Sequence, residues 1–192
     1  DGVSFQRLTD NESENSITFK LTSLILKERQ IETDSLCEQL FISPSTLGRK
    51  LRRHDVLLGD INAKISIANK VTAAGDESTL RFLHMLFMSL AYKSIDHIPE
   101  IDDPEKMRAL TQQILDYLGG PVLENQLQEC AMSVYVVNNA LSKGYQINSK
   151  DICVPYLEHY DFIKAPAFLD WGTWDWQHFL LTFYFSGKKF GQ

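Results

Sequence analysis

Cysteine is scarce in this chain of 192 residues: Cys37, Cys130 and Cys153 are the only three, and no two of them form a Cys-x-x-Cys pair. We therefore expect neither a zinc site nor a disulfide framework, and the chain fits the reducing cytoplasm. Long hydrophobic runs are missing too. The longest, Phe82 to Tyr92, covers only about half of a bilayer. We expect no membrane-spanning segment.

The motifs that carry catalysis are absent as well. The sequence contains no Gly-x-Ser-x-Gly, no P-loop, no Gly-x-Gly-x-x-Gly and no His-Glu-x-x-His. Gly119 and Gly120 stand before Pro121 at the end of a helical pattern, where they cannot form a phosphate loop after a strand. None of the five histidines pairs with another at metal-ligand spacing. We expect no catalytic residues, no cofactor and no metal, so the chain is not expected to be an enzyme.

The overall composition is that of a globular protein. Hydrophobic residues make up 44% and charged residues 23% of the chain, close to the average for soluble domains. The net charge of -6 argues against a protein that coats nucleic acid over its whole surface, but it allows a local basic patch. The chain starts at Asp1 without a basic-then-apolar leader, so we expect a piece of a longer protein.

One interruption divides the chain. Residues 73–78 break an alternating segment and precede a long helical pattern. We place the boundary near Gly75 and expect one domain over residues 1–74 and another over 75–192. The proline-rich and acidic stretch Asp96 to Pro104 is expected to be a surface loop within the second domain.

The first domain has the pattern of a winged helix-turn-helix. Apolar residues at helical spacing predict one helix over 17–27 and a short one near Leu36. Ser43 followed by Pro44 predicts the start of a third helix that ends near Leu58, because serine caps a helix and proline fits its first turn. Polar and apolar residues alternate over 64–67 and again over 70–73. This pattern predicts a hairpin whose turn is the dipeptide 68–69. Three helices followed by a small hairpin is the order of that fold.

The second domain is expected to be an all-α bundle of about five helices, because almost every segment after Gly75 has helical periodicity. Trp171, Trp174 and Trp176 lie within six residues of one another. They fit anchors of a helix against the bundle, with an exposed surface for a partner subunit or a pocket for an effector as the alternatives.

The third helix carries the most informative charges. Residues 43–54 contain four arginines or lysines and no acidic residue, although the chain is acidic overall. Hydroxyl groups at a helix N-terminus let phosphates approach, and arginine can bind guanine through two hydrogen bonds. A solvated helix face is the simpler explanation of such charges. The candidate DNA-binding residues, with two wing lysines on the DNA backbone, are Ser43, Ser45, Thr46, Arg49, Lys50, Arg52, Arg53, Lys64 and Lys70.

The order of features resembles a known family. Residues 36–49 (LCEQLFISPSTLGR), and later Ala74-Gly75-Asp76-Glu77 with Arg81, are similar to the second helix-turn-helix domain of the Mga and AtxA group of virulence regulators, relatives of the BglG-type sugar regulators. The resemblance covers about 90 residues, from Ser4 to Tyr92. It implies a transcription regulator that binds promoter DNA, with further domains before and after this chain.

The resemblance also implies that the remainder corresponds to the first PTS-regulation domain. In relatives this helical bundle mediates dimerisation and is phosphorylated on histidine by the sugar phosphotransferase system. The corresponding stretches 131–135 and 182–185 contain no histidine, and His178 adjoins the second of them. The resemblance thus implies a homodimer, phosphotransferase components as partners and His178 as a candidate phosphoacceptor. The alternative function is a protein–protein interaction module whose helix-turn-helix has lost contact with DNA.

Overall fold

The computed structural model describes residues 16–59, 61–120 and 123–185, without the side chains of 53–57 and 183–185. The chain divides into two compact units, Asp1–Ala91 and Tyr92–Gln192. This division falls later than the boundary that we expected near Gly75. The helix after Gly75 belongs to the first unit because its Leu80, Leu83 and Phe87 complete the core of that unit. The functional assignment of 1–74 and 75–192 stays a prediction.

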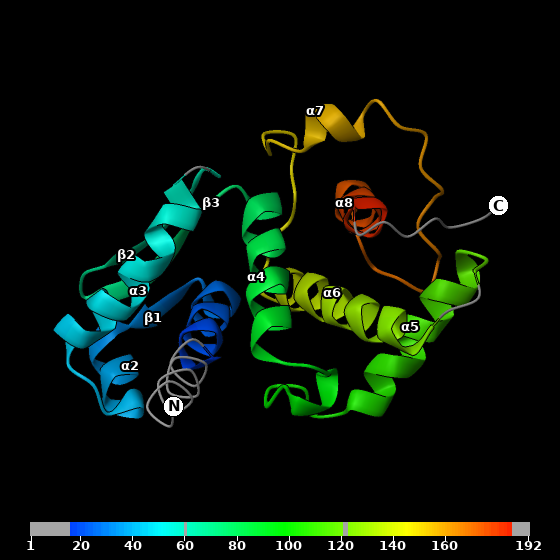
Figure 1. The fold of residues 1–192 in the computed structure, drawn as a ribbon. Coiled ribbons are helices and arrows are strands. Elements are labelled where there is room, and N and C mark those ends of the chain that lie inside the picture. Colours follow the sequence, from blue (N-terminus) through cyan, green and yellow to red (C-terminus); the bar gives the residue numbers. More distant parts are fainter. Residues whose placement is uncertain (1–15, 60, 121–122, 186–192) are drawn as a thin grey trace, which may run out of the picture. The chain divides into compact units, whose positions relative to one another are not determined.

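The first unit has the element order of a winged helix-turn-helix, as the sequence predicted (Figure 1). A helix runs through residues 16–28. The elements that follow it are β1 (Gln30–Glu32), α2 (Thr33–Leu40), α3 (Pro44–Gly59), β2 (Ala63–Ile67), β3 (Lys70–Gly75) and α4 (Glu77–Ala91).

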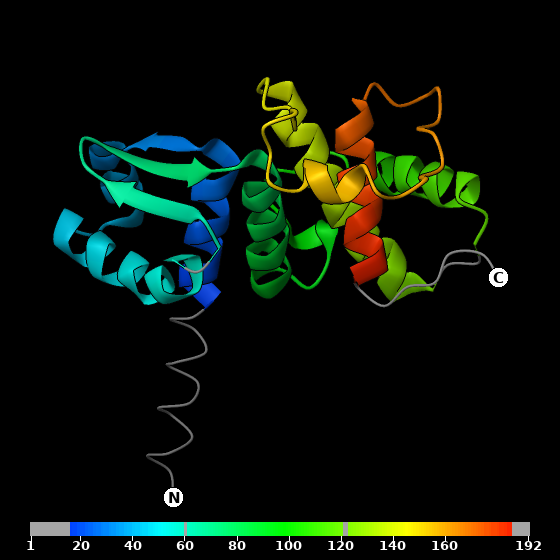
Figure 2. The ribbon, with the colours of Figure 1, turned by 90° about the horizontal axis from the view of Figure 1, so that it is seen from above.

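The sheet of this unit is antiparallel, with the strand order β1-β3-β2. The predicted hairpin is confirmed, and its register pairs Lys64 with Ala74. The strand β1, which pairs with β3, was not expected. Figure 2 shows the hairpin beside α3. Because alternate residues of a strand point to opposite faces, one face of the hairpin turns toward α3 and the core, and the other turns away.

The core of the first unit explains why these helices form. Leu36 of α2 and Leu47 and Leu51 of α3 are buried together with Val71 of β3. The two leucines of α3 lie four residues apart, which places them on one side of the helix. That side faces the core, and the remaining side of α3 is available for polar residues.

The tip of the hairpin is fastened to the start of α2. The Thr33 hydroxyl donates a hydrogen bond to the carbonyl of Ala68 at 2.7 Å, and the Thr33 backbone N–H donates to the carbonyl of Asn69 at 3.0 Å. Thr33 is buried. These bonds satisfy an N–H at the start of α2 that has no partner inside the helix, and they hold the hairpin tip in place.

The second unit is helical in the part that the structure describes. Its elements are the short 3-10 helix η1 (Ile95–His97), α5 (Pro104–Tyr117), α6 (Glu124–Ser142), α7 (Val154–Leu157) and α8 (Thr173–Phe185). The core gathers around Trp176 and Phe179 of α8, whose rings stack at 5.6 Å. The Trp171 indole N–H donates to Asn138 Oδ1 at 2.9 Å. These tryptophan contacts are the ones expected of anchors for α8.

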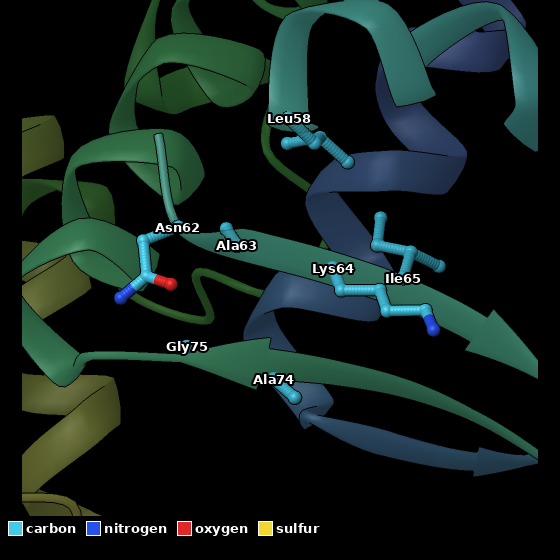
Figure 3. Close-up of a pocket in the computed structure, with 7 residues that line it drawn as sticks. All are labelled: Leu58, Asn62, Ala63, Lys64, Ile65, Ala74 and Gly75. Atoms are coloured by element: carbon cyan, nitrogen blue, oxygen red, sulfur yellow. The ribbon is translucent and has the colours of Figure 1, made fainter. Parts of the chain in front are cut away.

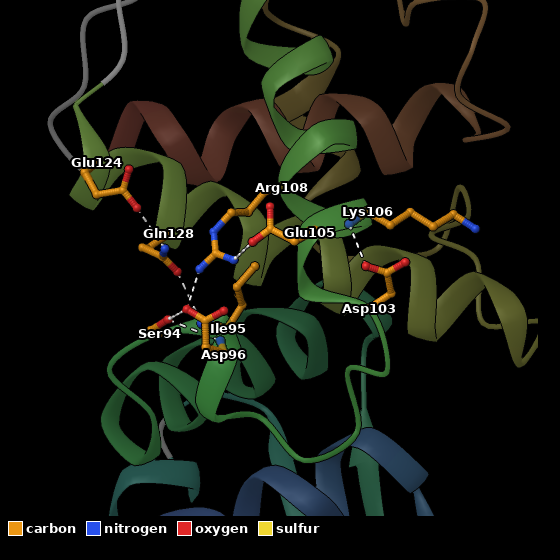
Figure 4. Close-up of polar contacts among 9 residues, drawn as sticks. All are labelled: Ser94, Ile95, Asp96, Asp103, Glu105, Lys106, Arg108, Glu124 and Gln128. Carbon is orange, nitrogen blue, oxygen red and sulfur yellow. Dashed lines mark hydrogen bonds and ion pairs between the residues drawn. The ribbon is translucent and has the colours of Figure 1, made fainter.

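A polar cluster joins η1 to α5 (Figure 4). The Arg108 guanidinium donates to the Asp96 carboxylate and, at 3.0 Å, to Glu105 Oε1. Hydrogen bonds from Arg108 and from Ser94 lower the pKa of Asp96 to about 2. The cluster therefore holds the connection between the two helices by charge. None of the helices in the described ranges has the length and apolar character needed to cross a membrane.

Candidate nucleic-acid interface

The N-terminus of α3 is built by hydroxyl groups. Ser43 Oγ accepts a hydrogen bond from the backbone N–H of Thr46 at 3.2 Å, so Ser43 caps the helix as the sequence predicted. The same hydroxyl lies 2.9 Å from Ser45 Oγ and 3.1 Å from Thr46 Oγ1. Three of the candidate residues thus form one exposed hydroxyl cluster, and the first turn of α3 contains no acidic residue. The partial positive charge of a helix N-terminus favours an anion at this place.

The turn before α3 is formed by Phe41. This residue has φ 53° and ψ 41°, the left-handed conformation that glycine usually adopts. The carbonyls of Cys37 and Glu38 accept backbone hydrogen bonds from Ile42 and Phe41, which closes α2. The Phe41 ring is 95% exposed. The turn is therefore tight, but the phenyl ring contributes almost no burial to it.

Three positively charged side chains of α3 are at least partly exposed to solvent. Arg49 and Arg52 are exposed and Lys50 is half-buried. Within the described residues, none of these three side chains makes a hydrogen bond or an ion pair. Arg53 also belongs to α3, but its side chain lies outside what the structure describes. The positive charges of Arg49, Lys50 and Arg52 are therefore available to a partner.

The two wing lysines lie elsewhere. The register pairs Lys64 with Ala74 and Lys70 with Glu32, and these residues share the sheet face that turns away from α3. Figure 3 shows Ile65 on the side of β2 nearest to Leu58, and Lys64, its neighbour in the strand, belongs to the opposite face. Lys70 Nζ lies 3.1 Å from Glu32 Oε1. The structure thus does not place the lysines beside the arginines of α3.

A hollow opens at the base of the hairpin (Figure 3). It has a volume of about 570 Å³ and is lined by Leu58 of α3, by Asn62 and by both strands, and Lys64 is the only charged residue among the described ones that line it. Among the described residues, the Asn62 carboxamide adds one neutral polar side chain, and backbone and aliphatic groups form the rest of the lining. This arrangement offers one charge to a ligand and few other polar side chains, so the hollow lacks the convergent polar groups of a specific small-molecule site.

A buried ionic cluster stabilises the first unit at the ends of β1 and α4. Glu77 Oε1 accepts hydrogen bonds from Arg29 Nη2 at 2.8 Å and from Arg81 Nε at 3.0 Å. Burial raises the pKa of Glu77, although both arginines act in the opposite direction. The cluster links the residue before β1 to the start of α4. It therefore fixes the ends of the elements that carry the hairpin.

The candidate phosphoacceptor belongs to the second unit. His178 is half-buried in α8 of the second unit, and its carbonyl accepts a hydrogen bond from Thr182 Oγ1 at 2.9 Å. Its role stays a prediction.

Two features of the interface were not predicted. Glu32 neutralises Lys70, a pairing that requires the unexpected strand β1. Gly48 faces Ile67 of β2. A Cβ atom added to Gly48 would lie 3.7 Å from Ile67 Cδ1. The glycine within the helical pattern was the available signal for the second feature, since glycine is unfavourable inside a helix.

Comparison with known proteins agrees with this geometry. A search of curated proteins found no match to the chain. The family model of the Mga helix-turn-helix domain matches residues 1–88. The match includes the capped α3, the hairpin and nearly all of α4, and it indicates DNA-binding transcription regulation. The first unit of this chain is thus similar to the Mga helix-turn-helix domain.

Proposed function

We propose that the chain recognises promoter DNA by inserting α3 into the major groove. The observation that carries this proposal is the outer side of α3, where Arg49 and Arg52 are exposed and make no ion pair within the described residues. An α-helix fits the major groove of B-DNA, and exposed guanidinium groups can reach the edges of its bases.

The individual roles follow from the chemistry of the side chains. Arg49 offers two parallel donors, which match the O6 and N7 acceptors of guanine, and Arg52 can bind a base edge or a phosphate in the same way. Ser45 and Thr46 at the N-terminus of α3 suit phosphate or base contacts at close range. Lys50 supplies a less directional charge. Ser43 stabilises the N-terminus of α3 by capping it. Arg53, which belongs to the same helix, is assigned to the DNA contacts from the sequence alone.

We expect the two wing lysines to contribute less to DNA binding than the residues of α3. Lys64 and Lys70 reach DNA only where the duplex extends past the hairpin, because they belong to the sheet face away from α3. Lys70 must also compete with Glu32 for its charge. We therefore assign them to the phosphate backbone and not to the bases.

The test is a titration of duplex DNA at two salt concentrations. Duplexes are first selected from a random pool with the 192-residue chain, and binding is then measured for wild type and Arg49→Ala. We expect at least tenfold weaker binding and a flatter salt dependence, because one positive charge is removed from the interface. Lys106→Ala, which removes one exposed positive charge from α5, is the control and should bind as wild type. Equal binding by Arg49→Ala would refute the proposal.

We also propose that the second unit regulates this binding, either by pairing two copies of the chain or by accepting a phosphoryl group on His178. In the second case the phosphoryl group passes from a phosphohistidine of a phosphotransferase component to the imidazole of His178, and the donor histidine is regenerated. Incubation of wild type and His178→Ala with that system, followed by detection of acid-labile phosphate, tests this role. Sedimentation equilibrium tests the homodimer.

A second candidate function is a protein–protein interaction module. One observation favours it: the exposed Phe41 lines a hollow together with the carboxylates of Asp34 and Glu38, and these negative charges would repel DNA. Failure of the chain to retain any duplex from a random pool, with the protein folded by circular dichroism, would favour this alternative over the first proposal.

A further inference from the structure

A groove runs between α3 and β2. It has a volume of about 330 Å³. Ser45, Gly48 and Arg52 line it from α3, and Ile65 and Ile67 line it from β2. The first three lie at intervals of three and four residues and therefore share one side of the helix. The groove thus adjoins the exposed side of α3 on which we place the DNA contacts.

The lining has two chemical parts. Among the described residues that line it, Arg52 is the only charged one, and none of them is a carboxylate. The Ser45 hydroxyl, already within reach of Ser43 Oγ at 2.9 Å, can rotate to donate toward the groove. The opposite wall is aliphatic, and Ile67 is 37% exposed. A ligand that fits both walls carries a negative charge next to apolar carbon.

Gly48 determines how deep the groove is. It lies in the interior of the 16-residue helix α3, where alanine would be the more favourable residue. The free protein does not require glycine here, since an added Cβ would make only an ordinary contact of 3.7 Å with Ile67 Cδ1. A side chain at this position would instead occupy part of the groove. The glycine therefore weakens the helix slightly and leaves space for another molecule.

We propose that this groove seats the sugar–phosphate backbone of one DNA strand at the edge of the major groove. The phosphate lies against Arg52 and Ser45, and the deoxyribose carbons lie against Ile67, with Gly48 giving the room for close approach. A DNA strand has this combination of anionic and apolar groups along its length. The inference rests on the proposed DNA binding and adds a second wall, supplied by β2, to the contacts of α3.

The first test is Gly48→Ala in the 192-residue chain, with a duplex selected by the wild-type protein. We expect a thermal unfolding temperature equal to or above that of wild type, because alanine favours the helix. We expect at least a tenfold loss of DNA affinity, because the added methyl group obstructs the strand. Unchanged affinity in a variant that folds as wild type would overturn the groove assignment.

The second test does not depend on how Gly48→Ala folds. Single methylphosphonates, which are uncharged, replace each phosphate of the duplex in turn, and binding is measured with wild type, Arg52→Ala and the control Lys106→Ala. We expect one or two positions whose neutralisation weakens wild type and the control at least fivefold but leaves Arg52→Ala nearly unaffected. The same loss in all three proteins would overturn the phosphate contact. Absence of any duplex binding by wild type would instead refute the proposed function itself.

Discussion

Lys70 and Glu32 form an ion pair across β3 and β1, with Nζ and Oε1 3.1 Å apart. Both side chains are more than half exposed, so the pair adds little to stability. Its main effect is on charge: it places a carboxylate beside a lysine that the sequence assigns to DNA binding.

Replacement of Glu32 by glutamine should strengthen DNA binding. The change releases Lys70 and removes a negative charge from the hairpin face, so we expect an increase in affinity of about threefold at low salt that disappears at high salt. Fluorescence titration at about 50 mM and about 300 mM salt, between which the Debye length falls by roughly half, measures this difference. Glu158→Gln, the same charge change in the second unit, should have no effect. A weaker complex with Glu32→Gln would show that the carboxylate itself supports binding.

Removal of the Glu77 carboxylate should destabilise the first unit strongly. Glu77→Ala leaves the buried guanidinium groups of Arg29 and Arg81 without their shared acceptor, and breaking such a buried pair costs about 3 kcal/mol or more. Urea unfolding measures the change. Glu38→Ala, at an exposed position of α2, should change the free energy of unfolding by less than about 0.5 kcal/mol. A loss below about 1 kcal/mol for Glu77→Ala would contradict the role of the cluster.

Phe41→Gly should stabilise the protein, against the usual effect of removing an aromatic side chain. The residue adopts a left-handed conformation that costs a side chain about 1 kcal/mol, while its 95% exposed ring loses almost no burial when it is removed. Thermal unfolding should show a rise of a few degrees for Phe41→Gly and no rise for Phe41→Ala, which keeps the strain. A lower unfolding temperature for the glycine variant would mean that the ring contributes contacts.

The acid response of Asp96 should depend on Arg108. The hydrogen bond from Arg108 lowers the pKa of Asp96 to about 2, below the value of an unfolded chain. Its contribution to stability is therefore present above about pH 4 and is lost as the pH falls through about 2. In Arg108→Ala the pKa of Asp96 should rise toward 4, as followed by NMR titration of the carboxyl carbon. Lys106→Ala should leave the pKa of Asp96 near 2; an unshifted pKa in Arg108→Ala would assign the effect to Ser94.

Local signals made much of the first unit predictable. The dipeptide Ser43-Pro44 marked the start of α3 within one residue, because capping chemistry acts over a single turn. The alternation around the dipeptide 68–69 predicted the hairpin and its turn. The outward position of Arg49 followed from the spacing of Leu47 and Leu51 alone.

Long-range partners could not be predicted in the same way. The strand β1 has only three residues, too few for a periodic pattern, and it forms because β3 offers a free edge. Arg29 and Glu77 are 48 positions apart, and no local rule pairs them. The amphipathic pattern of α4 revealed an apolar side but not which core would bury it. For these reasons the pairing of Lys70 and the extent of the first unit became clear only in three dimensions.

The bonds from Thr33 to the carbonyls of Ala68 and Asn69 have a consequence for the kinetics of recognition. Because the hairpin tip is held in place, the hairpin has little freedom to move in the unbound protein. It therefore loses little conformational entropy when the protein binds DNA. The hairpin then binds DNA without a change of its own conformation. Lengthening this turn with flexible residues would give the wing a longer reach, at the cost of a slower and less selective approach.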